Sequence, residues 1–475
     1  MTAQTILPAN SVTGGFEVAN SVRLDTNAYL HKTPSSSGNR KTWTASVWVK
    51  GQPTTTTNNI SGQAVYSAGN AATDRTHFYF TNGIFELRTE IGNTQQIITT
   101  NQVFTDPAAW YHIVVAVDST QSTDTNRVKI YANGSQITSF SAAAYLAEDA
   151  DTYVNHTVKQ YVGSSSWSAG SYFNGYMAEF VLLDGTAATP TSFGEFDEDS
   201  GIWKPINVSG LTFGTNGFYL DFEDASNLGN DANGGTDLTE VNLTAIDQST
   251  DTCTNNFCTL NPLDNFWPNH SYTDGNLTSQ SGTADGSPYT YVTSTMGFNT
   301  GKWYWEFKAV AKESGIDNWV AGFTSQRTTT TTLTYSAGTQ GYGMYGDSGV
   351  IYNNGSSAYG SGFTTGNTVM IAVDMDNLGA YWGVNGTWLN SSDPESGSNR
   401  TGAKVITAPT GDIGVYLPSW FWYEGDVNGT ASFNFGSPPY AISSGNTDGD
   451  GYGNFEYAVP SGYYALNTKN LAEYG

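Results

Sequence analysis

Two acidic side chains in the N-terminal half have a spacing that suggests glycoside hydrolysis. Glu195 and Asp197 lie two residues apart in the segment EFDEDS, residues 195–200. Hydrolysis of a glycosidic bond needs two carboxyl groups on opposite sides of that bond. Ser200 stands near the position where a second glutamate is required, and the stretch is turn-rich rather than alternating. We therefore interpret it as a surface loop, and we predict no catalytic residues and no enzyme activity.

Other residues that commonly carry chemistry are scattered. The chain has five histidines, at positions 31, 77, 112, 156 and 270. None of them has metal-ligand spacing, and neither a Gly-x-Ser-x-Gly elbow nor a phosphate-binding loop occurs. The two cysteines, Cys253 and Cys258, fit either incidental thiols or one small-loop disulfide.

One oxygen-rich turn resembles the start of a calcium loop. Asn446, Asp448 and Asp450 alternate in NTDGDG, residues 446–451. An EF-hand loop needs a glutamate at its twelfth position, but Glu456 falls at the eleventh and Tyr457 follows it. We interpret the segment as a glycine-rich turn, with a bound Ca²⁺ as the alternative. No other cofactor is predicted.

An aromatic run near the C-terminus is the candidate binding site. Trp420, Trp422 and Tyr423 lie in PSWFWYE, residues 418–424, just before a Gly-Asp-Val-Asn-Gly loop. Strand alternation would bury one face of this run and expose the other, where aromatic rings can stack on the apolar faces of sugars. Core packing is the competing interpretation of the same three residues.

The elements that must position these residues are strands. The 475 residues include 53 Gly, 29 Tyr, 23 Phe and 13 Trp, with only 13% charged residues. Aromatic residues favour pleated sheets and glycines supply turns, so the composition indicates an all-β protein. The length exceeds what one core usually supports, which indicates two domains. The net charge of −25 disfavours nucleic acid and anionic membranes as partners.

Alternation along the chain supports this fold class. In KWYWEFKAV, residues 302–310, Trp303, Trp305 and Phe307 share one face, whereas Tyr304 and Glu306 share the other. Such period-two patterns are typical of half-buried strands in sheets packed face to face. Residues 217–223 alternate in the same way. Asn-Gly pairs, which favour tight hairpins, recur along both halves.

The two halves repeat one pattern. Residues 111–118 (YHIVVAVD) and 127–134 (RVKIYANG) are echoed by 368–374 (TVMIAVD) and 379–386 (GAYWGVNG). Each pair reads as an apolar strand ending in Asp, a turn, and a strand ending in Asn-Gly. We predict two tandem antiparallel β-sandwiches, at residues 1–245 and 281–475, joined by a linker at 246–280. The threonine-rich segments 54–57 and 328–332 are predicted to be exposed loop tips.

The N-terminal half resembles a known family of sandwich domains. The segments 21–25 (SVRLD), 33–44 (TPSSSGNRKTWT), 47–50 (VWVK) and 173–180 (FNGYMAEF) are similar to laminin-G-like, concanavalin-A-type domains of phage tail and virion proteins. Residues 183–197 are similar to later strands of that module. The resemblance implies a jelly roll of the concanavalin A type over the first predicted domain.

The C-terminal half resembles a SPRY domain. This similarity rests on 301–307 (GKWYWEF), 321–323 (AGF), 367–386 and 431–436 (ASFNFG). Residues 252–264 and 470–475 are similar to segments of structural proteins from marine tailed phages. Together these resemblances imply a virion location and a binding function rather than a catalytic one.

Three functions compete at this point. The first is a tail fibre or appendage that attaches to a host-surface glycan or receptor, and a homotrimer is favoured there. The second is a capsid decoration protein, and the third is a free glycan-binding or glycan-cleaving protein. The first residues lack the pattern of a signal peptide, and no apolar run approaches the roughly 20 residues that span a membrane. We therefore expect synthesis in the host cytoplasm, assembly with other virion proteins and no membrane insertion.

Overall fold

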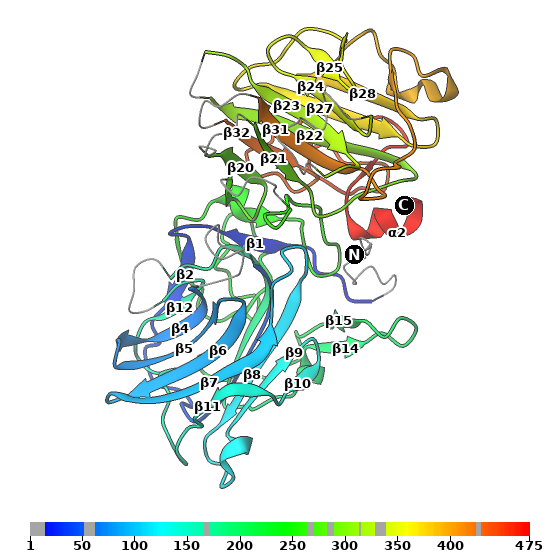
Figure 1. The fold of residues 1–475 in the computed structure, drawn as a ribbon. Coiled ribbons are helices and arrows are strands. Elements are labelled where there is room, and N and C mark those ends of the chain that lie inside the picture. Colours follow the sequence, from blue (N-terminus) through cyan, green and yellow to red (C-terminus); the bar gives the residue numbers. More distant parts are fainter. Residues whose placement is uncertain are drawn as a thin grey trace. The chain divides into compact units, whose positions relative to one another are not determined.

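The computed structural model describes most of the chain as two all-β units (Figure 1). The described residues are 15–51, 62–165, 171–264, 270–282, 289–312, 315–327, 339–423 and 429–475. Contacts divide the chain between Asn255 and Asn256. We call the described residues from 15 to 255 the N-terminal sandwich and those from 256 onward the C-terminal sandwich. The predicted fold class, two antiparallel β-sandwiches, is confirmed.

The N-terminal sandwich contains two large sheets, each with eight strands among the described residues. The first sheet has the order β10-β9-β8-β3-β13-β1-β18, with β16 beside β13. Its strands are β1 (Ser21–Leu24), β3 (Thr42–Gly51), β8 (Tyr111–Asp118), β9 (Val128–Ala132), β10 (Ser135–Ile137), β13 (Gly175–Asp184), β16 (Phe218–Leu220) and β18 (Gln248–Ser249). The second sheet has the order β11-β7-β6-β5-β4-β12-β2-β17. Its strands are β2 (Tyr29–Lys32), β4 (Gln63–Ala71), β5 (Asp74–Thr81), β6 (Ile84–Ile91), β7 (Thr94–Val103), β11 (Phe140–Ala143), β12 (Gln160–Val162) and β17 (Thr239–Val241).

Smaller elements complete this sandwich. A two-stranded hairpin is formed by β14 (Gly194–Phe196) and β15 (Trp203–Pro205), and three single turns of 3₁₀ helix are η1 (Asp124–Asn126), η2 (Pro190–Ser192) and η3 (Ala245–Asp247). The core between the two large sheets is apolar and includes Phe78, Phe80, Phe180 and Phe218, all less than 2% exposed. Burial of this apolar surface is the main source of stability in such a sandwich.

The outer face of the first sheet is covered by the chain that follows β13. Phe193, Val208 and Phe213 pack on that face with Val114 and Val181 of the sheet. A second covering cluster includes Trp203 and Cys253. The first sheet is therefore buried on both faces, which explains why its long strands β3 and β13 are almost completely buried.

The C-terminal sandwich also consists of two sheets, whose strand pairs are antiparallel except that β33 runs parallel to β22. The nine described strands of one sheet follow the order β19-β20-β32-β22-β27-β28-β29, with β30 beside β28 and β33 beside β22. These strands are β19 (His270–Thr273), β20 (Thr278–Ser281), β22 (Lys302–Ala311), β27 (Thr368–Asp374), β28 (Gly379–Val384), β29 (Thr387–Trp388), β30 (Lys404–Val405), β32 (Thr430–Asn434) and β33 (Tyr464–Ala465). The six described strands of the other are β21 (Tyr289–Thr293), β31 (Leu417–Tyr423), β23 (Trp319–Thr324), β24 (Gly341–Tyr345), β25 (Val350–Tyr352) and β26 (Ser356–Ala358), in that spatial order. The helical elements are η4 (Pro394–Asn399) and α2 (Thr468–Tyr474), and no helix of the described residues is long and apolar enough to cross a membrane.

The predicted alternation along β22 is confirmed. Trp303, Trp305 and Phe307 face the main core, and Tyr304 belongs to a separate cluster on the opposite face. Glu306, on that opposite face, accepts hydrogen bonds from the backbone N–H groups of Glu456 at 3.1 Å and Tyr457 at 2.8 Å. The C-terminal segment thus covers this face of the sheet.

The repeated hairpin is closed in the same way in both sandwiches. Asn133 Oδ1 accepts a hydrogen bond from His112 N at 2.8 Å, and Asn385 Oδ1 accepts one from Thr368 N at 2.9 Å. Both asparagines have positive φ angles, 46° and 47°, and each precedes a glycine of positive φ. This left-handed geometry is tolerated by Asn and Gly and explains the Asn-Gly signal at both turns.

The segment 246–280, predicted as a linker, is built into the two units where it is described. Strand β18 pairs with β1, and β19 and β20 join the nine-stranded sheet. Residues 251–260 are all buried. Local hydrogen bonds satisfy their polar side chains; for example, Thr252 Oγ1 accepts a hydrogen bond from Asn255 N at 3.2 Å. This segment can therefore be buried without the alternating apolar pattern of a strand. Cys253 and Cys258 are not joined by a disulfide bond, and each is buried within its own unit.

Candidate ligand-binding site

The site begins with strand β5, whose side chains alternate between the core and the outer face of the second sheet. Phe78 and Phe80 point into the core of the N-terminal sandwich. Arg75, His77 and Tyr79 stand at the odd-numbered positions of the same strand, which alternate with the core positions, and therefore lie on the outer face. Three large hydrogen-bonding side chains thus follow one another along a single strand.

Strand β6 places acidic and basic partners opposite these residues. Glu90 pairs in register with Arg75, Arg88 with His77, and Glu86 with Tyr79. Directly opposite residues of an antiparallel pair have their side chains on the same face of the sheet. The two strands therefore build one polar surface.

The two guanidinium groups are neutralised by ion pairs. Arg75 Nη2 lies 2.5 Å from Glu90 Oε1, with both side chains at least 93% buried, and Arg88 Nη2 lies 2.8 Å from Glu86 Oε1. Bidentate or closely paired Arg–carboxylate contacts of this kind fix side-chain orientation as well as charge. The surface consequently offers hydrogen-bonding groups without an excess of either charge.

Glu86 also orders the aromatic residue of the site. Its carboxylate accepts a hydrogen bond from the Tyr79 hydroxyl at 2.5 Å and another from Thr99 Oγ1 at 3.0 Å. The His77 ring stacks on the Tyr79 ring, with centroids 4.7 Å apart and an interplanar angle of 28°. Tyr79 is therefore held with a defined ring orientation while it stays partly exposed.

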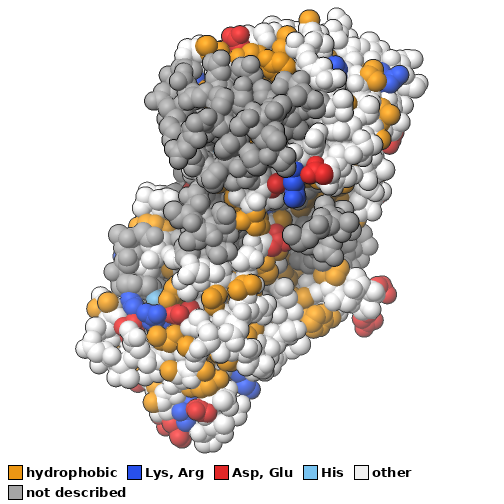
Figure 2. Space-filling model, in the orientation of Figure 1, with side chains coloured by type: hydrophobic (Ala, Val, Ile, Leu, Met, Phe, Trp, Pro, Cys, Tyr) orange, Lys and Arg blue, Asp and Glu red, His pale blue; other side chains and the backbone are white. Residues whose placement is uncertain are grey.

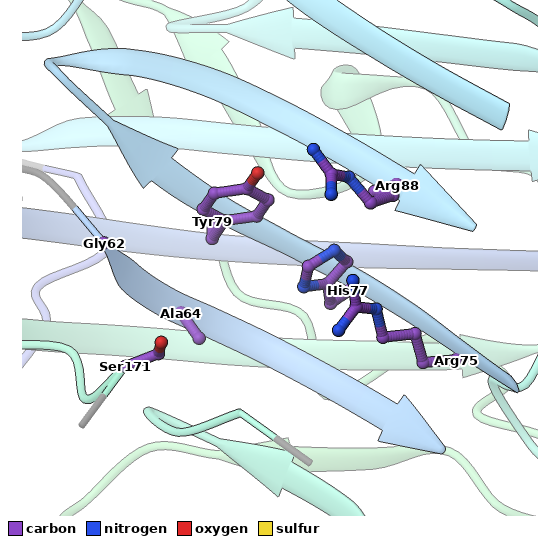
Figure 3. Close-up of a pocket in the computed structure, with 7 residues that line it drawn as sticks. All are labelled: Gly62, Ala64, Arg75, His77, Tyr79, Arg88 and Ser171. Carbon is purple, nitrogen blue, oxygen red and sulfur yellow. The ribbon is translucent and has the colours of Figure 1, made fainter. Parts of the chain in front are cut away.

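These side chains line a partly open pocket of about 200 Å³ (Figure 3). Its lining residues are Gly62, Ala64, Arg75, His77, Tyr79, Arg88 and Ser171. Figure 3 shows Arg75, His77 and Tyr79 in a row along one strand, with Arg88 beside them on the neighbouring strand. Basic, acidic and histidine side chains also lie together among hydrophobic ones on this side of the sandwich in Figure 2.

The protonation states follow from burial and neighbouring charge. Burial, together with the guanidinium charges of Arg75 and Arg88, holds the pKa of His77 well below its usual range, so its imidazole is neutral at neutral pH. Burial and the Glu86 carboxylate raise the pKa of Tyr79, which keeps its hydroxyl protonated. A neutral imidazole and a phenol can each donate and accept hydrogen bonds.

This arrangement is suited to binding an uncharged polar ligand. Tyr79 offers an aromatic surface, on which the apolar face of a sugar ring can stack. Arg88 offers donors, and the Tyr79 hydroxyl and the His77 ring add donor and acceptor capacity in the same pocket lining, as a set of hydroxyl groups requires. The paired charges leave little to attract an anion.

The aromatic residues predicted as the binding site lie elsewhere. Trp420 and Trp422, on β31 of the C-terminal sandwich, are 0% and 1% exposed and belong to its main core. Between them Phe421 packs on the opposite face with Tyr291 and Val320. The interpretation of Trp420 and Trp422 as sugar-stacking residues is therefore wrong, because both faces of this strand are covered. The side chain of Tyr423, the third predicted residue, is not among those that the structure describes.

In the candidate calcium loop, the carboxylate oxygens of Asp448 accept hydrogen bonds from other groups of the chain. Asp448 Oδ1 accepts from the backbone N–H groups of Asp450 at 3.0 Å and Tyr452 at 2.9 Å. Its Oδ2 accepts from Ala465 N at 3.0 Å and Asn470 Nδ2 at 2.8 Å. The carboxylate, only 6% exposed, therefore holds the loop against the following segment.

The other two members of the predicted calcium set do not join Asp448 as ligands. Asn446 donates to Ser444 Oγ at 3.0 Å, and Asp450 is exposed. Among the described residues, no group of three or more His, Cys, Asp or Glu side chains is arranged to hold a metal ion. The oxygen-rich pattern of residues 446–451 reflects a hydrogen-bonded turn.

The carboxylate pair of the N-terminal half lies on the β14–β15 hairpin. Lys204 Nζ lies 3.4 Å from Glu195 Oε1 and 3.1 Å from Asp197 Oδ2. Asp197 also accepts hydrogen bonds from Ser200 N at 2.9 Å and Ser200 Oγ at 2.8 Å. These bonds lower the pKa of Asp197 to about 2. A carboxyl group with so low a pKa is ionised at neutral pH and is a poor proton donor, so we interpret Asp197 as an anchor of the loop. The threonine-rich tips at 54–57 and 328–332 lie outside the described residues.

Sequence reasoning missed the β5–β6 pocket. The signal was present in DRTHFYFT, residues 74–81, where Arg, His and Tyr alternate with Thr and Phe. Such alternation marks a strand with a polar outer face, but by itself it does not distinguish a binding face from a solvated one.

Comparisons with known proteins agree with this architecture. Residues 24–191 match the family model described as the concanavalin A-like lectin/glucanases superfamily. A search of curated proteins found no match. The N-terminal sandwich therefore contains a concanavalin A-like domain, which is a general lectin-like class of fold.

Solved SPRY structures are among the structural neighbours. A SPRY domain of human HERC1 is 16% identical, with a TM-score of 0.28, over 37% of this chain and 96% of that one. A further human SPRY domain is 12% identical, with a TM-score of 0.26, over 37% and 98%. Stonustoxin is 17% identical, with a TM-score of 0.27, over 37% and 27%.

Proposed function

We propose that this chain is a virion surface protein of a tailed phage that attaches to host-surface glycans through the β5–β6 pocket. The observation that carries the proposal is the combination of Tyr79 and Arg88 in the lining of one partly open pocket, with the charge of Arg88 paired by Glu86 beside it. The match of residues 24–191 to a lectin and glucanase superfamily supports a carbohydrate ligand. The virion location rests on the sequence resemblances.

Binding without turnover is the activity that fits this pocket. The two carboxylates beside it, those of Glu86 and Glu90, are each engaged by an arginine, and Glu86 is further engaged by Tyr79 and Thr99. A general acid needs a carboxyl group that holds its proton near neutral pH. The carboxylates beside this pocket are instead committed to ion pairs and hydrogen bonds within the chain.

The test is a binding measurement on the purified chain with two substitutions at one position. Tyr79→Ala removes the stacking surface, and we expect it to lower the affinity for a bound glycan by roughly 3- to 10-fold. Tyr79→Phe keeps the ring and loses only the hydroxyl that donates to Glu86, so its loss is expected to be smaller. Titration calorimetry against glycans selected on a glycan array measures both.

Two outcomes would contradict the proposal. If the wild-type chain binds neither host cells nor any glycan on the array, the attachment function is rejected. Binding to purified capsids in that case would favour the capsid decoration function instead. Release of free sugar from a bound polysaccharide would show that the chain is an enzyme.

A further inference from the structure

A group of aromatic rings lies on the same outer face as the pocket. It consists of Tyr29, His31, Tyr161 and Tyr172, which we call the tyrosine–histidine platform. Tyr29 is 5.8 Å from Tyr161, 6.0 Å from His31 and 6.1 Å from Tyr172 between ring centroids. His31 and Tyr161 are 6.1 Å apart. All four side chains are half-buried, so part of each ring stays accessible.

The strand register places this platform beside the pocket. His31 of β2 pairs with Tyr161 of β12, and Tyr161 pairs with Ser67 of β4. Ser67 pairs in turn with His77 of β5. Directly paired residues have their side chains on the same face of the sheet. Neighbouring strands lie about 4.8 Å apart, so two strand spacings put the Cα atoms of Tyr161 and His77 about 10 Å apart.

The backbone links the two regions a second time. Ser171 lines the pocket, and the next residue, Tyr172, stacks on Tyr29 with an interplanar angle of 24°. Ser67, between Tyr161 and His77, is 0% exposed and donates to Ser164 O at 3.1 Å, so the direct path across the strands is covered. A ligand longer than one sugar ring would therefore pass from the pocket to the platform along Ser171 and Tyr172.

The charges of this face select against acidic ligands. Arg75 and Arg88 are already paired with Glu90 and Glu86. Lys159 lies over the Tyr161 ring, 5.7 Å from its centroid, and is the remaining cation beside the platform among the described residues. The chain as a whole carries 43 acidic and 18 basic residues. An anionic polymer would meet long-range repulsion with little local compensation.

The histidine of the platform is adapted to hydroxyl groups. Burial and the Lys159 charge hold the pKa of His31 below its usual value, so it is neutral at neutral pH. Its ring then carries one donor and one acceptor beside three tyrosine rings.

We infer that the tyrosine–histidine platform is a second subsite of the β5–β6 pocket and that the ligand is an uncharged oligosaccharide of at least two sugar rings. This inference rests on the proposed glycan-binding function. One ring occupies the pocket against Tyr79, and the next stacks on Tyr161 and Tyr29.

The experiment uses an array of neutral and anionic oligosaccharides, each series running from one to six sugar units. The neutral series are hexose and N-acetylhexosamine oligomers, and the anionic series contain uronic acids or sulfate esters. We expect the wild-type chain to prefer a neutral series and to bind two or three units roughly 3- to 10-fold more tightly than one. Titration of the free sugars then gives the affinity at each length.

Substitutions separate the two subsites. Tyr161→Ala should remove the gain with length, whereas Tyr79→Ala should weaken every length. His156→Ala is the matched control for His31→Ala, because His156 is also half-buried and stacks on a tyrosine, Tyr153, without lining either subsite. His31→Ala should reduce the gain with length, and His156→Ala should not.

The outcomes distinguish this inference from the proposed function. If no array member binds the wild-type chain, the glycan-binding function itself fails. If glycans bind but affinity is independent of length, or Tyr161→Ala retains the full gain with an unchanged circular dichroism spectrum, the second subsite is rejected. A preference for the anionic series would overturn the assignment of an uncharged ligand.

Discussion

The two outer faces of the N-terminal sandwich carry the same kinds of side chain but differ in what covers them. On the first sheet, His112 lies between Trp48 and Trp203, with ring centroids 4.8 Å and 5.9 Å away, and is 1% exposed. On the second sheet, His31 lies among tyrosine rings and is half-buried. Both faces thus combine histidine with aromatic rings. On the second sheet His77 is also buried, at 1% exposed, and the side chains that stay partly exposed there include Tyr79, Arg88 and His31.

The cover changes what the polar residues do. On the covered face, Lys50 and Asp251 form an ion pair at 2.7 Å with both side chains 1% exposed, and Trp110 Nε1 donates to the same carboxylate at 3.1 Å. These groups hold the covering segment in place. On the second sheet, the ion pairs of Arg75 and Arg88 lie beside a partly open pocket in which Tyr79 and Arg88 keep part of their surface exposed. The comparison teaches that accessibility, rather than residue type, separates structural polar groups from candidate binding groups.

The largest expected effect is the loss of the covered ion pair. Lys50→Ala leaves the Asp251 carboxylate buried without its ammonium partner, and we expect it to lower the free energy of unfolding by about 3–5 kcal/mol. Chemical denaturation measures this change. Lys159→Ala, on the accessible face, is the matched control and should leave the unfolding midpoint unchanged. Equal stability of the two variants would show that the covered pair has no structural role.

The second effect is a pH dependence on the covered face. Glu179 of β13 is buried and accepts a hydrogen bond from the Tyr219 hydroxyl at 2.7 Å, and burial raises its pKa to about 8. Because the folded-state pKa is above the ordinary value, its contribution to stability is complete below about pH 4.5 and is lost as pH rises through 8. We expect a loss on the order of 3 kcal/mol between pH 5 and pH 9.

Glu179→Gln tests this assignment, because glutamine does not titrate. Thermal unfolding of both chains across that pH range should give curves that diverge as pH rises, with the variant less affected. Parallel curves would mean that Glu179 ionises without cost in the folded chain.

A smaller effect is expected at Glu86 on the accessible face. Glu86→Gln weakens its bonds to Arg88 and Tyr79, and we expect a destabilisation of about 1–2 kcal/mol. The same change leaves the Arg88 guanidinium with only its longer ion pair, 3.8 Å to Glu90 Oε1, so relative affinity for anionic oligosaccharides should increase. The two readouts are chemical denaturation and the glycan array. An unaltered charge preference would indicate that Arg88 does not face the ligand.

The smallest effect on stability is expected at His31. Its ring is half-buried, and His31→Ala should change the free energy of unfolding by no more than about 0.5 kcal/mol. Urea denaturation gives this value. If the free energy of unfolding falls by several times this amount, His31 has a structural role like that of the covered residues. The two outer faces would then differ less in what their polar residues do.

Much of the fold could be predicted because its signals are local. Alternation in β22 fixes which of Trp303 and Tyr304 faces the main core, and the Asn-Gly pairs fix the turns at Asn133 and Asn385. Each of these features depends on a few consecutive residues and on the geometry of strands and turns. The all-β class and the division into two sandwiches follow from many such signals.

The candidate site could not be predicted in the same way, because accessibility depends on distant segments. Phe193 and Trp203, which cover the first sheet, follow its strand β13 in the sequence. The sequences of the strands themselves do not indicate that these residues will cover them. The run containing Trp420 and Trp422 has the same pattern as an exposed aromatic strand, yet both of its faces are covered. Asp448 likewise has the spacing of a calcium ligand but accepts four hydrogen bonds from the chain.

The pairing of β1 with β18 has a consequence for how such a module is exchanged between proteins. These are the first and last strands of the N-terminal sandwich, and Ser21 of β1 stands opposite Ser249 of β18. The chain therefore enters and leaves the sandwich on neighbouring strands, about 4.8 Å apart. A domain with adjacent entry and exit points can be inserted into a surface loop of another protein without stretching that loop. The N-terminal sandwich thus has the geometry of a transferable unit, which recombination between genes can add to or remove from a host scaffold.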